Sequence, residues 1–560
     1  MTTQLHPNED IKARSRFLRG TLAESLADDL TGAFAPADAQ ISKFHGFYEQ
    51  DDRDQRQDRL DRRLEPYYSF MLRARLPGGV CTLEQWLVID EIGRTLANGT
   101  LRLTTRQTFQ YHGILKRDLK GVIQGINRAL IDSIGGCGDV NRNVLCNPNP
   151  VESRLHAEAH DWARRISEHL LPKTRAYHEL WLDGEQVAGE ESEPLYGATY
   201  LPRKFKTAVA VPPINDVDVY ANDLGFIAIA DAGRLVGFNV LAGGGMGTTH
   251  RDTSTYPRLA DSLGFLPPEH TLAVAAAVVS VQRDFGNRVE RKLARLKYTI
   301  ETLGRDRFRA EVEERAGIRF EPARPIRFSE RGDRYGWVEG HDGRRHLTLF
   351  IENGRVVDRP GATMMTGLRE IARIHQGDFR ITPSQNLIVA GVAPEQADRI
   401  ETLAREHGLI QDQRSRVRLQ GIACVALPTC PQAMAEAERS FPEIVDAVEA
   451  LIARHGLGDL DLHLRMTGCP NGCARPFLAE VGLVGKAPGR YNLMLGGDDR
   501  GTRLNRLYRE NLSEAQILES LDGLLGRYAV EREPDERFGD FVIRAGIVRP
   551  VIDPARDFHE

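Results

Sequence analysis

The stretch from Gly421 to Pro476 determines how the rest of the chain is interpreted. It opens with G-I-A-C-V-A-L-P-T-C-P at 421–431 and closes with M-T-G-C-P-N-G-C-A-R-P at 466–476. Four of the seven cysteines lie here, as a C-x5-C pair (Cys424, Cys430) and a C-x3-C pair (Cys469, Cys473). Two pairs of thiolates are the ligand set of a tetrahedral metal ion or of a cubane iron–sulfur cluster.

The neighbours of these cysteines favour the cluster. Pro431 and Pro470 directly follow cysteines, so the chain leaves the ligands in a bent, non-helical path. Gly468 and Gly472 let backbone N–H groups approach the sulfur atoms. Structural zinc usually takes closer cysteine pairs, and disulfides are disfavoured because nothing marks the chain for export. Zinc and four unrelated buried cysteines remain the alternatives.

Bulk composition describes an ordinary soluble protein. At 560 residues the chain is too long for a single core, and about three or four domains are expected. The N-terminus has no apolar run, and no segment approaches the roughly 20 apolar residues that span a bilayer. We therefore expect a cytoplasmic enzyme. A net charge of −5 gives no reason to expect a nucleic-acid partner.

An internal repeat relates the two halves of the chain. L-R-L-T-T-R-Q-T-F-Q-Y-H-G-I at 101–114 matches F-R-I-T-P-S-Q-N-L-I-V-A-G-V at 379–392, at an offset of 278. The same offset aligns Cys146 with Cys424, and it holds across nearly sixty positions. We interpret the chain as a duplicated unit with pseudo-twofold symmetry, in which only the second copy has the full cysteine set.

Each copy is expected to begin with a strand, a helix and a second strand. The strands are predicted at 70–76 and 346–352, and the helices at 83–96 and 365–374. This order indicates ferredoxin-like half-domains. Further helices are expected at 156–171 and 433–449, the latter interrupted at Pro442, and further strands at 207–211 and 225–230. The predicted fold class is α+β, with two ferredoxin-like half-domains and two α/β domains.

Five segments follow from these patterns. Residues 1–65 include the charged run D-D-R-D-Q-R-Q-D-R-L-D-R-R-L at 51–64 and are expected to form an arm on the globular body. The first half-domain is placed at 66–135 and the first α/β domain at 136–330. The second half-domain is placed at 331–409 and the second α/β domain at 410–560.

Several basic residues stand in strand or turn contexts. Lys204 and Lys206 alternate in P-R-K-F-K-T-A-V-A-V, which puts both on one face of a strand entering a core. Arg73 lies in M-L-R-A-R-L and Arg142 in D-V-N-R-N-V. Each alone is more often a solvated surface charge. The run G-G-G-M-G at 243–247 could cradle an anion, although such runs are commonly turns. No flavin or nicotinamide motif is present.

Taken together, these motifs resemble the sulfite and nitrite reductase family that uses sirohaem and a [4Fe–4S] cluster. The resemblance runs from L-R-G-T-L at 18–22 to R-P-V-I-D-P-A-R-D at 549–557. T-G-C-P-N-G-C, R-L-T-T-R-Q-T-F-Q, D-V-N-R-N-V and L-P-R-K-F-K are its most specific parts.

The resemblance implies roles for individual residues. Cys424, Cys430, Cys469 and Cys473 would bind the cluster, and Cys473 would also be the axial ligand of the sirohaem iron. The substrate would be surrounded by Arg73, Arg142, Lys204 and Lys206. The macrocycle would be held by Arg102, Thr104, Arg106, Gln110, His112, Lys297, Gln385 and Asn471. The domain at 136–330 would carry sirohaem and substrate contacts, and that at 410–560 the cluster.

The implied activity is the six-electron reduction of sulfite to sulfide, which belongs to sulfate assimilation and cysteine biosynthesis. Electrons would come from a separate NADPH-oxidising flavoprotein subunit, with the charged arm as its docking element. The alternatives are a sirohaem nitrite reductase and a ferredoxin-dependent sulfite reductase. The two lysines of K-F-K favour sulfite over nitrite, and K-F-H-G-F-Y-E-Q-D-D-R-D at 43–54 resembles the NADPH-linked type. A zinc-stabilised binding module is the alternative from another class.

Overall fold

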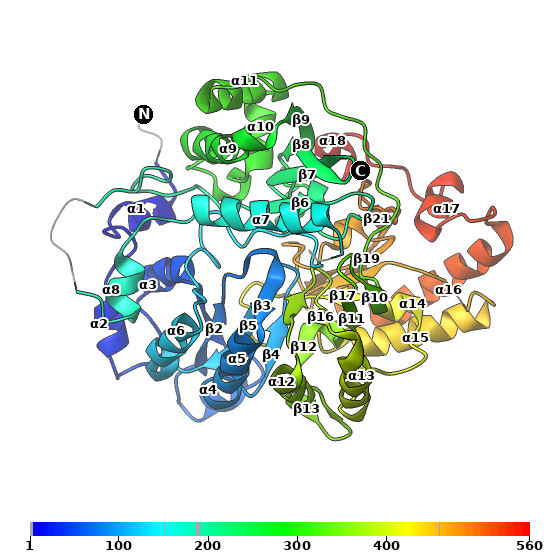
Figure 1. Cartoon of the computed structure of the whole chain (residues 1–560), viewed down its shortest axis with the longest axis horizontal. Coiled ribbons are helices and arrows are strands. Elements are labelled where there is room, and N and C mark those ends of the chain that lie inside the picture. Colours follow the sequence, from blue (N-terminus) through cyan, green and yellow to red (C-terminus); the bar gives the residue numbers. More distant parts are fainter. Residues whose placement is uncertain (1–3, 150–151, 186–190, 459, 560) are drawn as a thin grey trace.

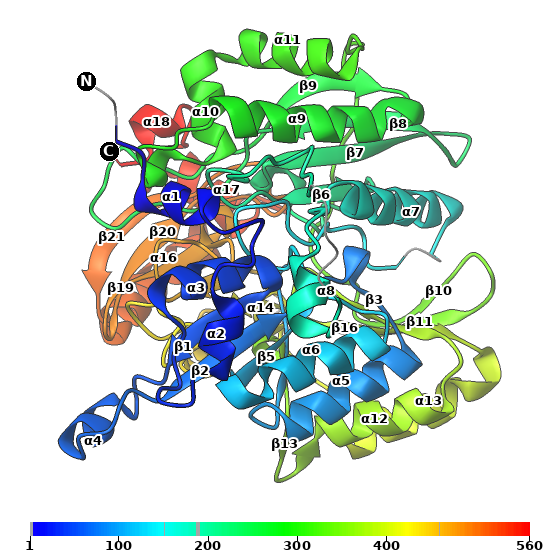
Figure 2. The ribbon, with the colours of Figure 1, turned by 90° about the vertical axis from the view of Figure 1, so that its left-hand side faces the viewer.

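The structure is a computed structural model that describes residues 4–149, 152–185, 191–458 and 460–559 (Figures 1 and 2). These residues contain four β-sheets of four or five strands and one two-stranded sheet. The four larger sheets form two pairs of similar topology, and each pair has one sheet based in the first half of the sequence and one in the second.

The first ferredoxin-like sheet is antiparallel and has the strand order β1-β2-β5-β4-β12. The helices α5 and α6 belong to this half-domain, and α5 begins with a capping box between Thr82 and Gln85. The bounds are β1 (Phe47–Asp51), β2 (Tyr68–Arg73), β4 (Leu101–Leu103), β5 (Phe109–Ile114), β12 (Arg355–Val356), α5 (Leu83–Thr95) and α6 (Leu119–Arg128).

The second ferredoxin-like sheet has the order β10-β11-β16-β15-β3, and it is also antiparallel. Helices α12 and α13 pack against each other beside it. The bounds are β3 (Val80–Thr82), β10 (Gly336–Glu339), β11 (Arg345–Leu349), β15 (Asp378–Ile381), β16 (Leu387–Val392), α12 (Met364–Ile374) and α13 (Ala397–Glu406), and a small hairpin of β13 (Asp358–Arg359) and β14 (Ala362–Thr363) precedes α12.

Each of these sheets takes an edge strand from the other copy. β12 of the second copy pairs with β4, and β3 of the first copy pairs with β15. The crossing is tight, because a Cβ on Gly79 would lie 2.3 Å from the Ile381 carbonyl oxygen and one on Gly354 would lie 2.2 Å from that of Leu103. Leu103 and Ile381 are equivalent positions of the repeat, so the exchange is symmetrical.

The turn after each R-x-T strand also repeats. The Thr104 N–H donates to the Thr108 carbonyl at 2.9 Å, and the Thr382 N–H donates to that of Asn386 at 2.9 Å. Gln107 and Gln385, at equivalent positions, both have a left-handed backbone, with φ of 50° and 72°. The duplication predicted from the sequence is therefore present in the backbone itself.

The two larger mixed sheets complete the halves. In the first, β6 runs parallel to β7, and β8 and β9 follow antiparallel; in the second, β17, β18 and β19 are parallel and β20 and β21 antiparallel. The bounds are β6 (Thr207–Ala210), β7 (Leu224–Asp231), β8 (Arg234–Ala242), β9 (Asp261–Leu266), β17 (Ile422–Ala423), β18 (Leu464–Thr467), β19 (Val481–Ala487), β20 (Arg490–Leu495) and β21 (Arg506–Leu512).

Helices cover these mixed sheets on the outside (Figure 1). α7 packs on β6 and β8 and against α9, which also contacts α10 and α11, while α16 packs on β20, β21 and α15. The bounds are α7 (Arg154–His169), α8 (Ala176–Trp181), α9 (Thr271–Phe285), α10 (Leu296–Leu303), α11 (Arg305–Ala316), α14 (Arg416–Leu419), α15 (Phe441–Arg454), α16 (Glu514–Glu531), α17 (Phe538–Arg544) and α18 (Pro554–Asp557).

The N-terminal segment corrects the prediction of an arm at 1–65. Its described residues up to β1 belong to the body: α1 (Pro7–Ala13), α2 (Leu22–Ala27) and α3 (Pro36–Ile41) precede β1, which pairs with β2. Leu18, Leu22, Phe44 and Phe47 are fully buried in the main core. Only α4 (Arg56–Asp61), which has no buried residue, projects from the body (Figure 2).

A second correction concerns the helix predicted at 433–449. The observed helix α15 begins only at Phe441, with Pro442 in its first turn, where a missing N–H costs nothing. Residues 433–440 form turns instead. They lie beside the C-x5-C pair, and the Met434 and Ala435 N–H groups donate to the Gly468 carbonyl at 2.7 and 3.1 Å.

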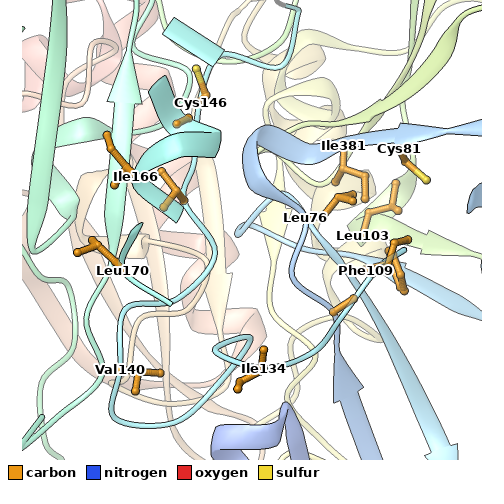
Figure 3. Close-up of a cluster of buried hydrophobic side chains, with 14 of the residues drawn as sticks. Leu76, Cys81, Leu103, Phe109, Ile134, Val140, Cys146, Ile166, Leu170 and Ile381 are labelled. Carbon is orange, nitrogen blue, oxygen red and sulfur yellow. The ribbon is translucent and has the colours of Figure 1, made fainter. Parts of the chain in front are cut away.

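The largest hydrophobic core joins both half-domains to the first mixed sheet. Figure 3 shows part of it, where Leu103 and Phe109 of the first half-domain lie near Ile381 of the second. Cys81 and Cys146 are buried in this core, and burial raises the pKa of both thiols well above the usual value. Both residues therefore behave as apolar packing groups.

The strand exchange predicts a difference between two glycines. Gly354→Ala should lower the free energy of unfolding by about 3 kcal/mol, because the methyl group meets the Leu103 carbonyl and the backbone is left-handed. Gly343 has a similar φ of 76° but open space around it, so Gly343→Ala should cost only about 1 kcal/mol. Denaturant unfolding of both variants measures this, and equal losses would show that the crossing is not tightly packed.

Candidate functional site

A deep cavity between the two halves brings most of the predicted site residues together. Its volume is about 390 Å³. All four motif cysteines line it, as do Arg73, Arg102, Gln110, His112, Arg142, Lys204, Gln385 and Asn471. Thr104, Arg106, Lys206 and Lys297 are not among the lining residues.

The cysteines line this cavity from the loops that follow β17 and β18. The Gly468 N–H donates to Cys424 Sγ at 3.3 Å, as expected for a glycine next to a metal-binding thiolate. Burial raises the pKa of Cys424 and Cys430, and the nearby Cys473 raises both further. Grouped thiols that resist ionising together are stabilised as thiolates by a bound metal centre.

The donor set of these thiols fits a cluster better than a single ion. In the described part of the chain, no group of three or more His, Cys, Asp or Glu side chains is arranged to hold one metal ion. Zinc would draw all four sulfurs to within about 2.3 Å of one point. A four-iron cluster instead takes four cysteine thiolates as its ligands. The four-thiol donor set lining one open cavity therefore fits the cluster.

Arg73 and Arg142 enter the cavity from the first half. Arg73 donates to Cys137 Sγ at 3.3 Å, and its Nε lies 2.9 Å from the Gln110 amide oxygen. Arg142 donates to the Gly138 carbonyl at 3.1 Å and to the Tyr48 hydroxyl at 3.3 Å. Neither guanidinium forms an ion pair with a carboxylate of the described residues.

Lys204 and Lys206 are two half-buried lysines without a carboxylate partner, and of the two only Lys204 lines the cavity. Burial lowers the pKa of Lys204 to about 7, and repulsion from Arg203 and Arg295 adds to the effect. Burial, Arg106 and Lys204 lower the pKa of Lys206 well below its usual value. Neither ammonium has a carboxylate within ion-pair distance in the described chain. An anion bound in the cavity beside Lys204 would favour the charged form of both lysines.

Arg102 is engaged in an ion pair at the cavity wall. Its Nε lies 2.8 Å from Glu438, which also binds Arg355 at 2.6 Å. Burial alone would raise the pKa of Glu438, but Arg355 and Arg102 outweigh it and lower this pKa to about 2. Beside them, burial and the same two arginines lower the pKa of His112, which is therefore neutral.

Arg106 and Lys297 support the wall from behind. Arg106 donates to Asn222 Oδ1 at 2.9 Å and to the Asn143 carbonyl, while the Thr104 hydroxyl accepts from its backbone N–H at 3.2 Å. Lys297 donates to the Gly247 carbonyl at 2.9 Å and to those of Gly245 and Tyr256. In the run at 243–247, the carbonyl groups of Gly245 and Gly247 thus bind Lys297, and this contact supports the cavity wall.

Sequence reasoning missed several residues of the cavity. Lys43 and Tyr48 line it from the segment interpreted as an arm, and Arg203 and Arg291 line it as further cations. Arg203 could have been found, because it stands directly before Lys204 in L-P-R-K-F-K. Lys43 gave no signal, because nothing in its local sequence indicates that the chain folds back onto the cavity.

Sequence reasoning also missed Asp218. This residue connects both halves of the chain behind the loop of Cys469 and Cys473. Its carboxylate lies 2.6 Å from Arg475 Nε, 2.7 Å from Arg465 Nη1 and 3.5 Å from Arg331 Nη1. All four side chains are buried. Burial alone would raise the pKa of Asp218, but the arginines outweigh it and hold this pKa well below the usual range. Arg475 also donates to the Pro383 carbonyl at 2.9 Å.

Comparison with known proteins identifies the family. The sulfite reductase [NADPH] hemoprotein beta-component of Thiocapsa roseopersicina is 69% identical to this chain, with all of both chains covered. The protein of the same name from Shewanella sp. (strain ANA-3) is 62% identical, covering 99% of this chain and 98% of its own. The chain belongs to the nitrite and sulfite reductase family.

Family models describe the same duplicated architecture. The nitrite/sulfite reductase ferredoxin-like half domain matches residues 62–129 and 338–407, and the nitrite and sulphite reductase 4Fe-4S domain matches 161–320. The latter range contains none of the four motif cysteines and corresponds to the first copy. The NirA protein of Mycobacterium tuberculosis has the same fold, with a TM-score of 0.78 at 24% identity over 97% of this chain and 98% of its own.

Membership of the nitrite and sulfite reductase family confirms several predictions. The α+β duplicated fold, the enzyme class and the two cofactors, sirohaem and a [4Fe–4S] cluster, agree with it. The zinc-stabilised binding module is excluded. In the described residues, no helix combines the length and apolarity required to cross a bilayer.

The contacts of Asp218 predict a coupled loss of stability and metal. Asp218→Asn leaves three buried arginines without their carboxylate and should destabilise the chain by about 3–5 kcal/mol. Because Arg475 follows Cys473 by two residues, iron content per chain should fall as well.

Asp90 provides the matched control. It is a buried aspartate that pairs with Arg94 and Arg369, far along the chain from the cysteines. Asp90→Asn should destabilise the chain but leave its iron content unchanged. Full iron content in purified Asp218→Asn would contradict a role of Asp218 in holding the cysteine loop.

Proposed function

We propose that this chain is the haemoprotein component of an NADPH-dependent sulfite reductase and reduces sulfite to sulfide. Relatives covering its whole length, at 62–69% identity, carry that name. One observation of the structure carries the proposal: a single cavity is lined both by four thiols and by three half-buried cations without a carboxylate partner, Arg73, Arg142 and Lys204. This is the arrangement expected where a metal centre reduces an anion.

Cys424, Cys430, Cys469 and Cys473 would hold the cluster, and Cys473 would also ligate the sirohaem iron. The exposure of the four thiols supports this division, since Cys473 is exposed to the cavity and the other three are buried or half-buried. When bound, the two cofactors supply the electron transfer to the substrate.

The cavity wall fits a polar macrocycle. His112 Nδ1 and Gln385 Oε1 are buried and have no hydrogen-bond partner in the described chain, so both are available to a ligand. We assign direct contacts to Arg102, Gln110, His112, Gln385 and Asn471, which line the cavity. Thr104, Arg106 and Lys297 would act through the backbone that they brace.

Arg73, Arg142, Lys204 and Lys206 would bind and polarise the substrate. Sulfite is an anion, and fixed cations in a partly desolvated cavity stabilise it far more than they would in water. Reduction to sulfide consumes six electrons and removes three oxygen atoms as water, so protons must be delivered at the same place. Lys204 can hold or release a proton near neutral pH, because its pKa is lowered to about 7.

Substrate preference is the direct test of this assignment. With reduced viologen as the donor, kcat/KM should be higher for sulfite than for nitrite, and the product should be sulfide. Lys204→Met should lower kcat/KM for sulfite by about 100-fold, the size of a lost general acid. Lys120→Met, at a half-exposed lysine paired with Asp183, should leave it unchanged. A clear preference for nitrite would show that the enzyme is a nitrite reductase instead.

The pH profile gives a second measurement on Lys204. Its protonated fraction falls as pH rises through its pKa, so kcat/KM for sulfite should decline on the alkaline side. The carboxylates of bound sirohaem would raise this pKa. The decline is therefore expected at pH 7 or above. Lys204→Met should lose this limb of the profile.

The electron donor is proposed to be a flavoprotein alpha subunit, and the complex is placed in the cytoplasm. The name "beta-component" of the relatives implies an alpha subunit for them. We place the docking element at α4, because Arg53, which lies shortly before this helix, contacts the loop that contains Cys430. Arg53 donates to the Pro428 carbonyl at 3.0 Å, to the Ala433 carbonyl at 2.9 Å and to that of Cys430. A subunit bound at α4 would lie next to the cysteines.

Charge reversal on α4 tests the docking proposal. Arg56, Arg59 and Arg62 changed together to Glu should lower NADPH-driven turnover of the reconstituted complex at least 10-fold, since interface charges set association. Viologen-driven turnover should not change, because Arg53 is kept. Reversal of Arg305 and Arg307 on α11 serves as the control. Unchanged NADPH-driven turnover in the α4 variant would mean that the flavoprotein binds elsewhere.

A further inference from the structure

A second, small cavity lies at the junction of the two halves, separate from the cavity of the cysteines. Its volume is about 30 Å³, which is room for one ion or one water molecule. It is lined by the segment after Cys146, the loop after β6, the linker that leads to β10, and residues of β10, β11 and β16. Its polar residues among those described are Asn147, Asn149, Glu152, Asp216, Asp333, Arg334 and Thr348.

Three oxygen atoms around this cavity have no hydrogen-bond partner in the described chain. They are Asp216 Oδ1, Asp333 Oδ1 and Asn149 Oδ1. The other carboxylate oxygens are satisfied: Asp216 Oδ2 accepts from Asn147 at 2.8 Å, and Asp333 Oδ2 accepts from Thr382 at 2.6 Å and Asn386 at 2.7 Å. The Asn149 side chain is only 7% exposed, so water outside the protein does not satisfy its oxygen.

No basic side chain balances the two carboxylates. Arg334, which also lines the cavity, forms its ion pair with Glu152. Neither Asp216 nor Asp333 has an ion pair among the described residues. Burial raises the pKa of both, and in Asp216 the neighbouring Asp333 raises it further. Asp216 is buried and Asp333 is half-buried, and two neighbouring acids with free oxygens are costly unless a positive charge lies between them.

We propose that this cavity binds one hard cation, Ca²⁺, through Asp216 Oδ1, Asp333 Oδ1 and Asn149 Oδ1. Carboxylate and amide oxygens are the ligands that Ca²⁺ takes in proteins, with water completing the coordination. Two positive charges balance the two carboxylates. Water could fill the space but would leave both carboxylates uncompensated, and one shared proton would satisfy only part of the oxygen set.

The position of the site indicates a structural role. Asn147 and Asn149 lie in the segment after Cys146 of the first copy, and Asp333 lies in the linker to the second half-domain. Through Thr382 and Asn386, Asp333 also holds the turn of the second copy that is equivalent to Thr104–Thr108. The cation would therefore join the two halves at a point that neither exchanged strand reaches.

Thermal unfolding of the cofactor-loaded full chain tests the site. In 1 mM CaCl₂ the midpoint should lie at least about 2 °C above that in EGTA, as binding to the folded state alone requires. Asp216→Asn should abolish this shift, and its midpoint in EGTA should equal or exceed the wild-type value because the repulsion with Asp333 is gone. Asp90→Asn, the buried control, should lower the midpoint equally in both buffers and keep the shift.

Each result decides one part of the proposal. One Ca²⁺ per chain after gel filtration, lost in Asp216→Asn, would support the site. A larger shift with Mg²⁺, Na⁺ or K⁺ would overturn the choice of Ca²⁺. No shift with any of these cations, or an equal shift in wild type and Asp216→Asn, would falsify the cation site itself.

Discussion

Half-buried positive charge without a carboxylate partner is the constraint on which this structure depends. Arg73, Arg142, Lys204 and Lys206 all lack such a partner among the described residues. Desolvation lowers the pKa of both lysines, and repulsion from the neighbouring cations Arg203, Arg295 and Arg106 adds to it. The fold offsets this cost behind the cavity wall, where Asp218, Glu438 and Asp223 each bind buried arginines. The cations proposed to bind the substrate have no carboxylate partner, whereas the arginines bound by Asp218, Glu438 and Asp223 are paired.

The two copies of the repeat contribute different residues to this site. The first copy supplies the cations on the segments around β2, β6 and residue 142, and the second supplies the cysteines after β17 and β18. The contact between them is direct, because the Thr248 N–H donates to the Pro470 carbonyl at 2.9 Å and the Thr105 hydroxyl donates to that of Cys473 at 3.1 Å. A symmetrical scaffold thus holds an asymmetrical site.

The sequence predicted well what depends on local chemistry. The cysteine pairs, the K-F-K alternation and the 278-residue repeat are local patterns, and the structure brings the cysteines and Lys204 to one cavity. Long side chains were predicted less well, since Arg106 and Lys297 reach backbone carbonyls behind the wall. The arm was misjudged because its charged run masks widely spaced apolar residues, such as Leu22 and Phe47, whose burial depends on distant strands. No local pattern could show that Asp218 would meet three arginines, one of them 113 and another 247 residues away.

The exchange of β3 and β12 bears on how such a chain could have arisen. Each half-sheet gains an edge strand only from the other copy, and the crossing point accepts no side chain larger than glycine's hydrogen. A protein of half this length with the same strands would have to obtain that edge from a second molecule. The closed, twofold solution to that requirement is a strand-swapped homodimer. In these terms the present chain is such a dimer joined into one polypeptide, and its two halves have been free to diverge because they are always made together.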